Sequence, residues 1–300
     1  MVAGRRPAGR LRQRLRPGAD RRRRGGGALL DLGGAYQAQF AGDAVASEAS
    51  FTRALAGFRE TGDRWGMANC LDPLGLFAGR RGEYARAVEL LDEGLRYVRE
   101  LRAPEETADL LRSRGTVLLH RGDTEEAVAH LTPSMALART AGAPDKVAAA
   151  RRGLGDAARL AGDAAHARVQ YETALQACAA NWFSLGETVL ILVGLGRAAA
   201  ADGDLGQARD WFARARALAD EPPGPKPLAA VAEALASVAE DPERAAELLG
   251  AAAGLRGSGP HTDPDVVGTE RAARARLSTG AYARAFARGR SLRSAAVSER

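Results

Sequence analysis

Small and large apolar residues recur along this chain of 300 residues with a period of 40 or 41 residues. Each period is marked by a glycine, and the five glycines are Gly42, Gly82, Gly122, Gly162 and Gly203. Five residues after the glycine comes a small residue such as Ala87, nine after it a large apolar one such as Leu91, and twelve after it another small one such as Gly94. Because these positions share one face at helical spacing, a helix is predicted after each glycine.

A second glycine lies seven residues before the first in four of the periods, at Gly75, Gly115, Gly155 and Gly196. Apolar residues around it also recur at helical intervals, which predicts another helix before the turn. Glycine can adopt the left-handed conformation that closes this helix, and the acidic residue that follows can accept the free N–H groups of the next one. Helical hairpins at such a period stack on their neighbours. The layout resembles the tetratricopeptide repeat and predicts an all-α, right-handed α-solenoid.

The repeat region is predicted to cover residues 28–220. Its helical pairs are expected at 28–40 with 46–60, 64–79 with 84–100, 104–120 with 124–139, 144–160 with 164–178, and 182–201 with 205–219. A proline-rich stretch at 221–227 should break the array. A further helical pair at 228–256 and C-terminal helices with a frayed end at 265–300 follow it.

Two prolines, Pro73 and Pro133, fall inside predicted helices. A proline there costs about 3 kcal/mol unless the helix kinks. Alternatively, Asp72 could cap a helix that restarts at Pro73.

Charge is unevenly distributed along the chain. The whole chain carries +6, residues 1–27 carry +9 and residues 271–300 carry +7, so that residues 28–270 carry −10. Residues 1–27 are rich in Arg and Gly without an apolar period, and we expect them to be disordered. An arginine-rich arm could hold phosphate groups of nucleic acid, but a solvated tail is the simpler interpretation. The acidic body makes nucleic-acid binding by the folded part unlikely on charge grounds.

The sequence also bears on disulfides, metal sites, catalysis and membrane spans. The cysteines Cys70 and Cys178 are far apart in the sequence and are expected to be buried thiols in a reducing cytoplasm. The histidines share no spacing typical of metal ligands, and no motif orients a catalytic acid or base. No apolar run approaches the roughly 18 residues of a membrane span. We therefore expect a cytoplasmic protein without cofactor or catalytic activity, whose oligomeric state the sequence leaves open.

Longer segments carry a more specific resemblance. FRETGDRWGMANCLDPLGLFAGRRGEYARAVELLDEGL, GLGDAARLAGDAAHARVQYETAL and ERAAELLGAAAGLRG resemble the C-terminal helical region of large bacterial ATP-binding transcriptional regulators of the LuxR and antibiotic-regulator types. The resemblance implies a sensor region that receives a ligand or partner signal. The phosphate-binding loop Gly-x4-Gly-Lys-Ser/Thr of such regulators is missing from this sequence, as is a helix-turn-helix after residue 290, so neither the ATPase nor DNA binding is carried over.

Two functions remain open from the sequence: a sensor module of a transcriptional regulator, or a free-standing adaptor that binds an acidic peptide in its groove. In tetratricopeptide arrays the first helix of each hairpin lines the concave groove. Applied to this register, the expected groove residues are Asp72, Leu76, Arg112, Thr116, Arg152, Asp156, Arg159, Val193 and Arg197. Arg112 and Arg152 occupy equivalent positions and could together hold a carboxylate or phosphate. Asp156, one turn after Arg152, could instead pair with it.

Overall fold

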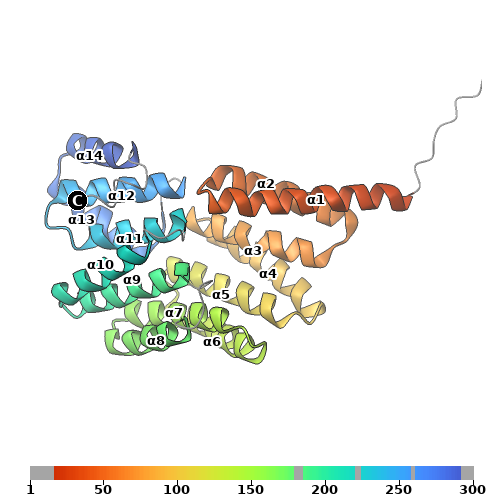
Figure 1. The fold of residues 1–300 in the computed structure, drawn as a ribbon, viewed down its shortest axis with the longest axis horizontal. Coiled ribbons are helices and arrows are strands. Elements are labelled where there is room, and N and C mark those ends of the chain that lie inside the picture. Colours follow the sequence, from red (N-terminus) through yellow and green to blue (C-terminus); the bar gives the residue numbers. More distant parts are fainter. Residues whose placement is uncertain (1–16, 179–184, 220–223, 258–260, 292–300) are drawn as a thin grey trace, which may run out of the picture.

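The chain is described by a computed structural model that places residues 17–178, 185–219, 224–257 and 261–291. Over these residues it is all-helical, which confirms the predicted fold class. The helices are α1 (Pro17–Phe40), α2 (Ala44–Thr61), α3 (Arg64–Arg80), α4 (Tyr84–Glu100), α5 (Pro104–Arg121), α6 (Thr124–Thr140), α7 (Pro144–Leu160), α8 (Ala164–Cys178), α9 (Leu185–Ala201), α10 (Leu205–Ala219), α11 (Pro225–Ser237), α12 (Pro242–Arg256), α13 (Pro264–Arg276) and α14 (Thr279–Ser291). Neighbouring helices pack as antiparallel hairpins from α1 to α12 (Figure 1).

The turns between hairpin helices follow the predicted mechanism. All five marker glycines have a positive φ, which is 78° at Gly42 and 86° at Gly162. At three of the five turns the next aspartate caps the following helix, and Asp163 accepts a hydrogen bond of 2.9 Å from the backbone N–H of His166. Only glycine adopts this left-handed backbone at little cost, so each turn closes in the same geometry.

The predicted small–large–small face is the packing face. Ala167, Tyr171 and Ala174 of α8 are fully buried, as are the equivalent residues of the other repeats. The second glycine of each hairpin makes room for the large residue: a Cβ atom added to Gly155 would lie 2.6 Å from Cε1 of Tyr171. The repeat register assigned from the sequence is therefore confirmed by burial.

This packing leaves no room for a larger side chain at Ala174. We expect Ala174→Leu to lower the free energy of unfolding by roughly 1–3 kcal/mol, because an overpacked core forces strained rotamers or backbone shifts. Gln176→Leu is the matched control, since Gln176 is exposed on the same helix. Circular dichroism melts should separate the two variants, and an unchanged melt for Ala174→Leu would contradict the packing described.

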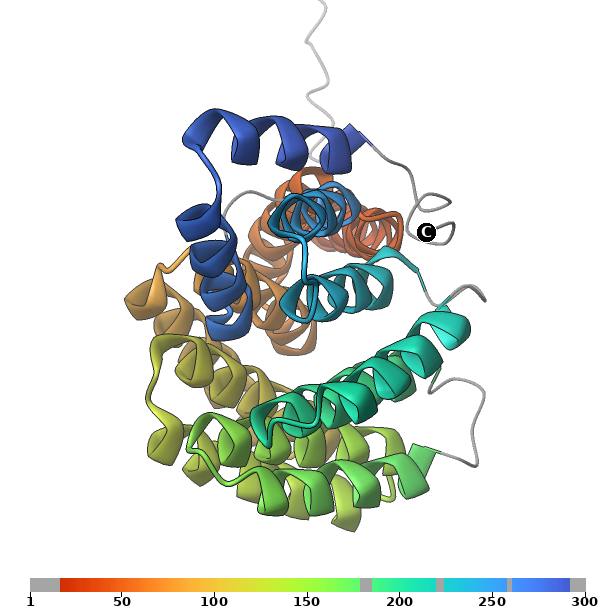
Figure 2. The same ribbon diagram turned by 90° about the vertical axis from the view of Figure 1, so that its left-hand side faces the viewer.

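The hairpins wind into a superhelix that brings the two ends of the array together. The odd-numbered helices from α3 to α13 contact one another in sequence. Both views place the C-terminal helices α11–α14 beside the first hairpins (Figures 1 and 2). Backbone contacts join these ends, since a Cβ on Gly42 would lie 2.6 Å from the carbonyl oxygen of Leu255, and the Thr262 hydroxyl donates to the carbonyl of Gly79 at 3.0 Å.

Several boundaries differ from the predicted ones. Helix α1 begins at Pro17, so residues 17–27, expected to be disordered, are helical, while residues 1–16 lie outside the described part. α1 lies along α2 only from Gly25 onward, since Gly25 faces Thr61, the last residue of α2. The array also continues past the proline-rich stretch: α11 begins at Pro225, where proline suits the first helical turn, and packs on α9 and α10.

The helices around the internal prolines are unbroken. α3 runs through Pro73 and α6 runs through Pro133, so Asp72 does not start a new helix but lies in the middle of α3.

The last two helices depart from the hairpin pattern, because α14 packs mainly on α12 rather than on α13. Cys70 and Cys178 are buried thiols, as predicted. Within the described ranges no helix is long and apolar enough to span a bilayer.

Candidate functional site: a charged channel

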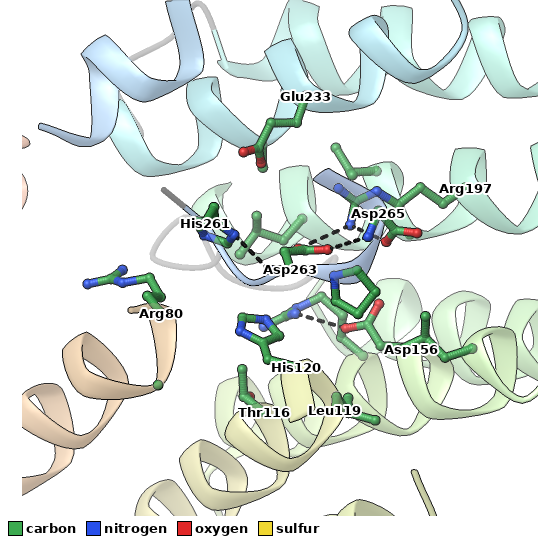
Figure 3. Close-up of a pocket in the computed structure, with 18 of the residues that line it drawn as sticks. Arg80, Thr116, Leu119, His120, Asp156, Arg197, Glu233, His261, Asp263 and Asp265 are labelled. Atoms are coloured by element: carbon green, nitrogen blue, oxygen red, sulfur yellow. Dashed lines mark hydrogen bonds and ion pairs between the residues drawn. The ribbon is translucent and has the colours of Figure 1, made fainter. Parts of the chain in front are cut away.

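The superhelix encloses a channel with a cavity of about 190 Å³. Its walls come from the odd-numbered helices α3, α5, α7, α9 and α11, and from residues between the end of α12 and the start of α13. Figure 3 shows charged side chains from these elements converging on it. The first helix of each hairpin faces the channel because the second helix covers its other side.

The structure brings most of the predicted groove residues to this channel. Those that line it are Leu76, Arg112, Thr116, Arg152, Asp156, Arg159, Val193 and Arg197. Asp72 is the exception, since it lines a small separate pocket with Tyr36 and Asp109. Burial raises the pKa of the Asp72 carboxyl, and the nearby Arg112 opposes that shift. Both expected positions therefore line the channel in the hairpins that begin with α5, α7 and α9, whereas in the hairpin that begins with α3 only Leu76 does.

Arg152 is held by acids and is not an open anion site. Its Nε lies 2.5 Å from Oε1 of Glu187 and its Nη1 lies 3.3 Å from Oδ2 of Asp156. The hydroxyl of Tyr171 donates to Asp156 at 2.7 Å. The pairing left open by the sequence is thus the observed one, so Arg112 and Arg152 do not form a free pair of forked donors.

The opposite wall of the channel is formed by residues 261–265, which we call the acidic segment. Asp265 accepts two hydrogen bonds from Arg159, at 2.9 and 2.7 Å, and lies 3.0 Å from the guanidinium of Arg197. Asp263 lies 3.8 Å from Arg197, and the positive charges around it hold the pKa of its carboxyl well below the usual range (Figure 3). Two acids of the chain itself therefore pair with two of the predicted groove arginines, Arg159 and Arg197.

Two histidines meet beside this segment. The rings of His120 and His261 are 5.8 Å apart, and Nδ1 of His261 accepts a hydrogen bond from the backbone N–H of Asp263. Burial lowers the pKa of both, and that of His261 falls to about 3. Both imidazoles are therefore neutral near pH 7, and within the described residues no group of three metal-binding side chains surrounds them.

Three cations of the channel were missed by the sequence analysis: Arg80, Lys226 and Arg256. Arg80 had a usable signal, because it stands five residues after a repeat glycine, as His120 does in the next repeat. Lys226 lies in the proline-rich stretch, which has no counterpart in the other repeats. Arg256 ends α12 and pairs with the buried Glu233. The channel thus holds more positive charge than the repeat register predicted.

Comparison with known proteins agrees with this architecture. Residues 106–180 match the family model of the tetratricopeptide repeat. No curated protein matches the chain by sequence. Among solved structures, a Rap protein complexed with Competence and Sporulation Factor is similar with a TM-score of 0.67 at 14% identity, over 87% of this chain and 71% of that one.

Two further Rap structures are similar. The Rap conjugation gene regulator of plasmid pLS20, in complex with a Phr peptide, gives a TM-score of 0.62 at 11% identity, over 84% of this chain and 77% of that one. The apo form of RapI gives 0.51 at 13% identity, over 83% and 84%. At these identities the likeness establishes the fold alone. The chain is a tetratricopeptide-like helical repeat protein.

Proposed function

We propose that this protein binds an acidic peptide segment in its channel. The observation that carries the proposal is the pairing of Asp263 and Asp265 with Arg197 and Arg159. Asp263 is the N-cap of α13 and Asp265 lies in its first turn, so the channel already holds a chain segment with acids two residues apart. A partner segment of the same charge pattern would make the same charge-assisted hydrogen bonds.

The cavity sets a limit on how such a peptide enters. A volume of about 190 Å³ accommodates a few side chains rather than a whole peptide. A peptide therefore enters by displacing the acidic segment, and competition between the two should set the affinity. Rap proteins of this helical architecture are found in complex with Competence and Sporulation Factor and with the Phr* peptide, which supports a peptide as the partner.

We further infer that the channel serves as the input site of a sensor module of a transcriptional regulator. The three segments that resemble such regulators support this context. The alternative is an adaptor unconnected with transcription. A reading frame for a phosphate-loop ATPase, joined to or directly beside this one in the genome, would favour the regulator, and unrelated neighbouring genes would favour the adaptor.

The peptide HTDPDVVG, which copies residues 261–268, tests the proposal. The double variant Asp263→Asn/Asp265→Asn should bind it roughly tenfold more tightly than the unaltered protein, because the internal competitor has lost its charge. The control peptide HTNPNVVG should not bind. Isothermal titration calorimetry measures both, and equal binding of the two peptides would contradict the proposal.

A further inference from the structure

The cations of the channel divide into two groups. Four of the seven lining cations are matched by acids: Arg152, Arg159, Arg197 and Arg256. The other three are Arg80, Arg112 and Lys226. Arg80 and Lys226 make no ion pair or hydrogen bond with any described residue, and Arg112 reaches the Ser113 hydroxyl at 3.3 Å and Asp109 at 4.0 Å and lies near the carboxyl of Asp72.

The three remaining cations come from separate elements and all line the channel, and the charges of Arg80 and Arg112 both act on Lys226. Arg80 ends α3, Arg112 lies on α5 and Lys226 lies in the first turn of α11. Arg80 and Lys226 also line, on their other side, a small cavity of about 40 Å³ against the first hairpin, so the two side chains stand next to each other. In Figure 3 no ion pair or hydrogen bond is drawn to Arg80, whose guanidinium lies 4.6 Å from the centre of the Phe77 ring, whereas Arg197 is connected to Asp263 and Asp265.

The protein surroundings make this juxtaposition unfavourable without an anion. Lys226 is exposed to the water of the channel, which solvates its charge in part. Burial and then the charges of Arg80, Arg112 and Arg152 lower the pKa of Lys226 to about 8. Burial also lowers the pKa of Arg80. Like charges gathered on the wall of one channel repel one another, and a bound anion would reduce that cost.

We propose that Arg80, Arg112 and Lys226 form a binding site for a dianionic oxyanion of the phosphate type. Two guanidinium forks and one ammonium supply donors for several oxygens of one group, and a phosphate fits the cavity without displacing the acidic segment. A single carboxylate would neutralise only one of the three charges. The site shares the channel of the proposed peptide function but lies apart from Arg159 and Arg197, so each can fail without the other.

Inorganic phosphate is the probe for this site. Titration calorimetry with the full chain should show saturable binding of phosphate, and acetate at the same ionic strength should not bind. Lys226→Met and Arg80→Met should each weaken phosphate binding roughly tenfold or more, since each removes a charge-assisted contact. Arg209→Met is the matched control, because Arg209 is exposed outside the channel and pairs with Glu240 at 2.8 Å.

Protonation provides a readout that a structural role of Lys226 would not give. An anion favours the charged ammonium, so its pKa should rise from about 8 when phosphate binds. Binding at pH 8 should therefore take up a fraction of a proton, measured as a dependence of the heat on the ionisation enthalpy of the buffer. The part of the proton uptake that is lost in the Lys226→Met variant is the contribution of the Lys226 ammonium.

The outcomes are separable. Absence of saturable phosphate binding at millimolar concentration, or unchanged binding in both Lys226→Met and Arg80→Met with native circular dichroism, would overturn the anion site. Phosphate binding without any binding of HTDPDVVG to the Asp263→Asn/Asp265→Asn variant would support the anion site and contradict the peptide function. Peptide binding that is unaffected by saturating phosphate would support two separate subsites.

Discussion

Replacing Tyr171 by alanine should destabilise the middle of the array by about 3–5 kcal/mol, the cost of deleting a fully buried aromatic side chain. Tyr171 has no exposed surface and fills the space above two glycines, Gly155 of α7 and Gly194 of α9. Its removal would therefore open a cavity shared by three consecutive helices. In a linear repeat protein such a defect weakens the interface between neighbouring hairpins and lowers cooperativity.

Amide hydrogen exchange localises this effect better than a single melting temperature. We expect loss of protection in α7–α9 of Tyr171→Ala, with α3 and α4 affected less. Tyr171→Phe is the control, since it keeps the ring and removes only the hydroxyl that donates to Asp156. It should cost about 1 kcal/mol, because Asp156 retains its contact with Arg152. Equal protection in Tyr171→Ala and the unaltered protein would show that the aromatic ring does not hold the hairpins together.

The hairpins could be predicted because everything that forms them is local. The turn glycine, the acidic residue that follows it and the face containing Ala167, Tyr171 and Ala174 all lie within one period. Their mutual spacing determines which side of each helix is buried. The helix predicted at 124–139 is observed at Thr124–Thr140, for the same reason.

Which residues line the channel depends on how successive hairpins are rotated against one another, and the repeat period does not specify that rotation. A small rotation between neighbouring repeats decides whether the array stays open or returns to its start. Here it returns, and contacts join Arg159 with Asp265 and Gly79 with Thr262, which are 106 and 183 residues apart in sequence. No local pattern predicts that Asp263 and Asp265, at the start of α13, face the groove.

The first helix shows a similar limit. Residues 17–27 have no apolar period, so the sequence predicted disorder there. Over residues 25–27 the helix has a neighbour to pack against, because Gly25 faces Thr61, the last residue of α2. In this part a tertiary contact supports a helix that the glycines and charged residues would not form by themselves.

Removing both arginines that hold the acidic segment should release it from the channel. In the double variant Arg159→Met/Arg197→Met, Asp263 and Asp265 would face a channel without their partners, and leaving a buried charge unpaired costs about 3 kcal/mol. We expect the segment and α13 to lose protection in hydrogen exchange and the contact between Thr262 and Gly79 to open. The rest of the array should stay folded, because its hairpins do not depend on this contact.

The same contact should respond to acid in a defined direction. The pKa of Asp263 is depressed in the folded protein, so the stability that it contributes is complete above the usual carboxyl pKa and is lost as the pH falls below it. The unaltered protein should therefore keep α13 protected at pH 5 and lose that protection in stronger acid, whereas Arg159→Met/Arg197→Met should lack it at both. Adding Asp263→Asn/Asp265→Asn to the arginine variant tests the charge argument directly, because removing both sides of an ion pair costs less than removing one. Protection of α13 should then recover in part, and a quadruple variant as open as the double variant would show that shape, and not charge, holds the segment in the channel.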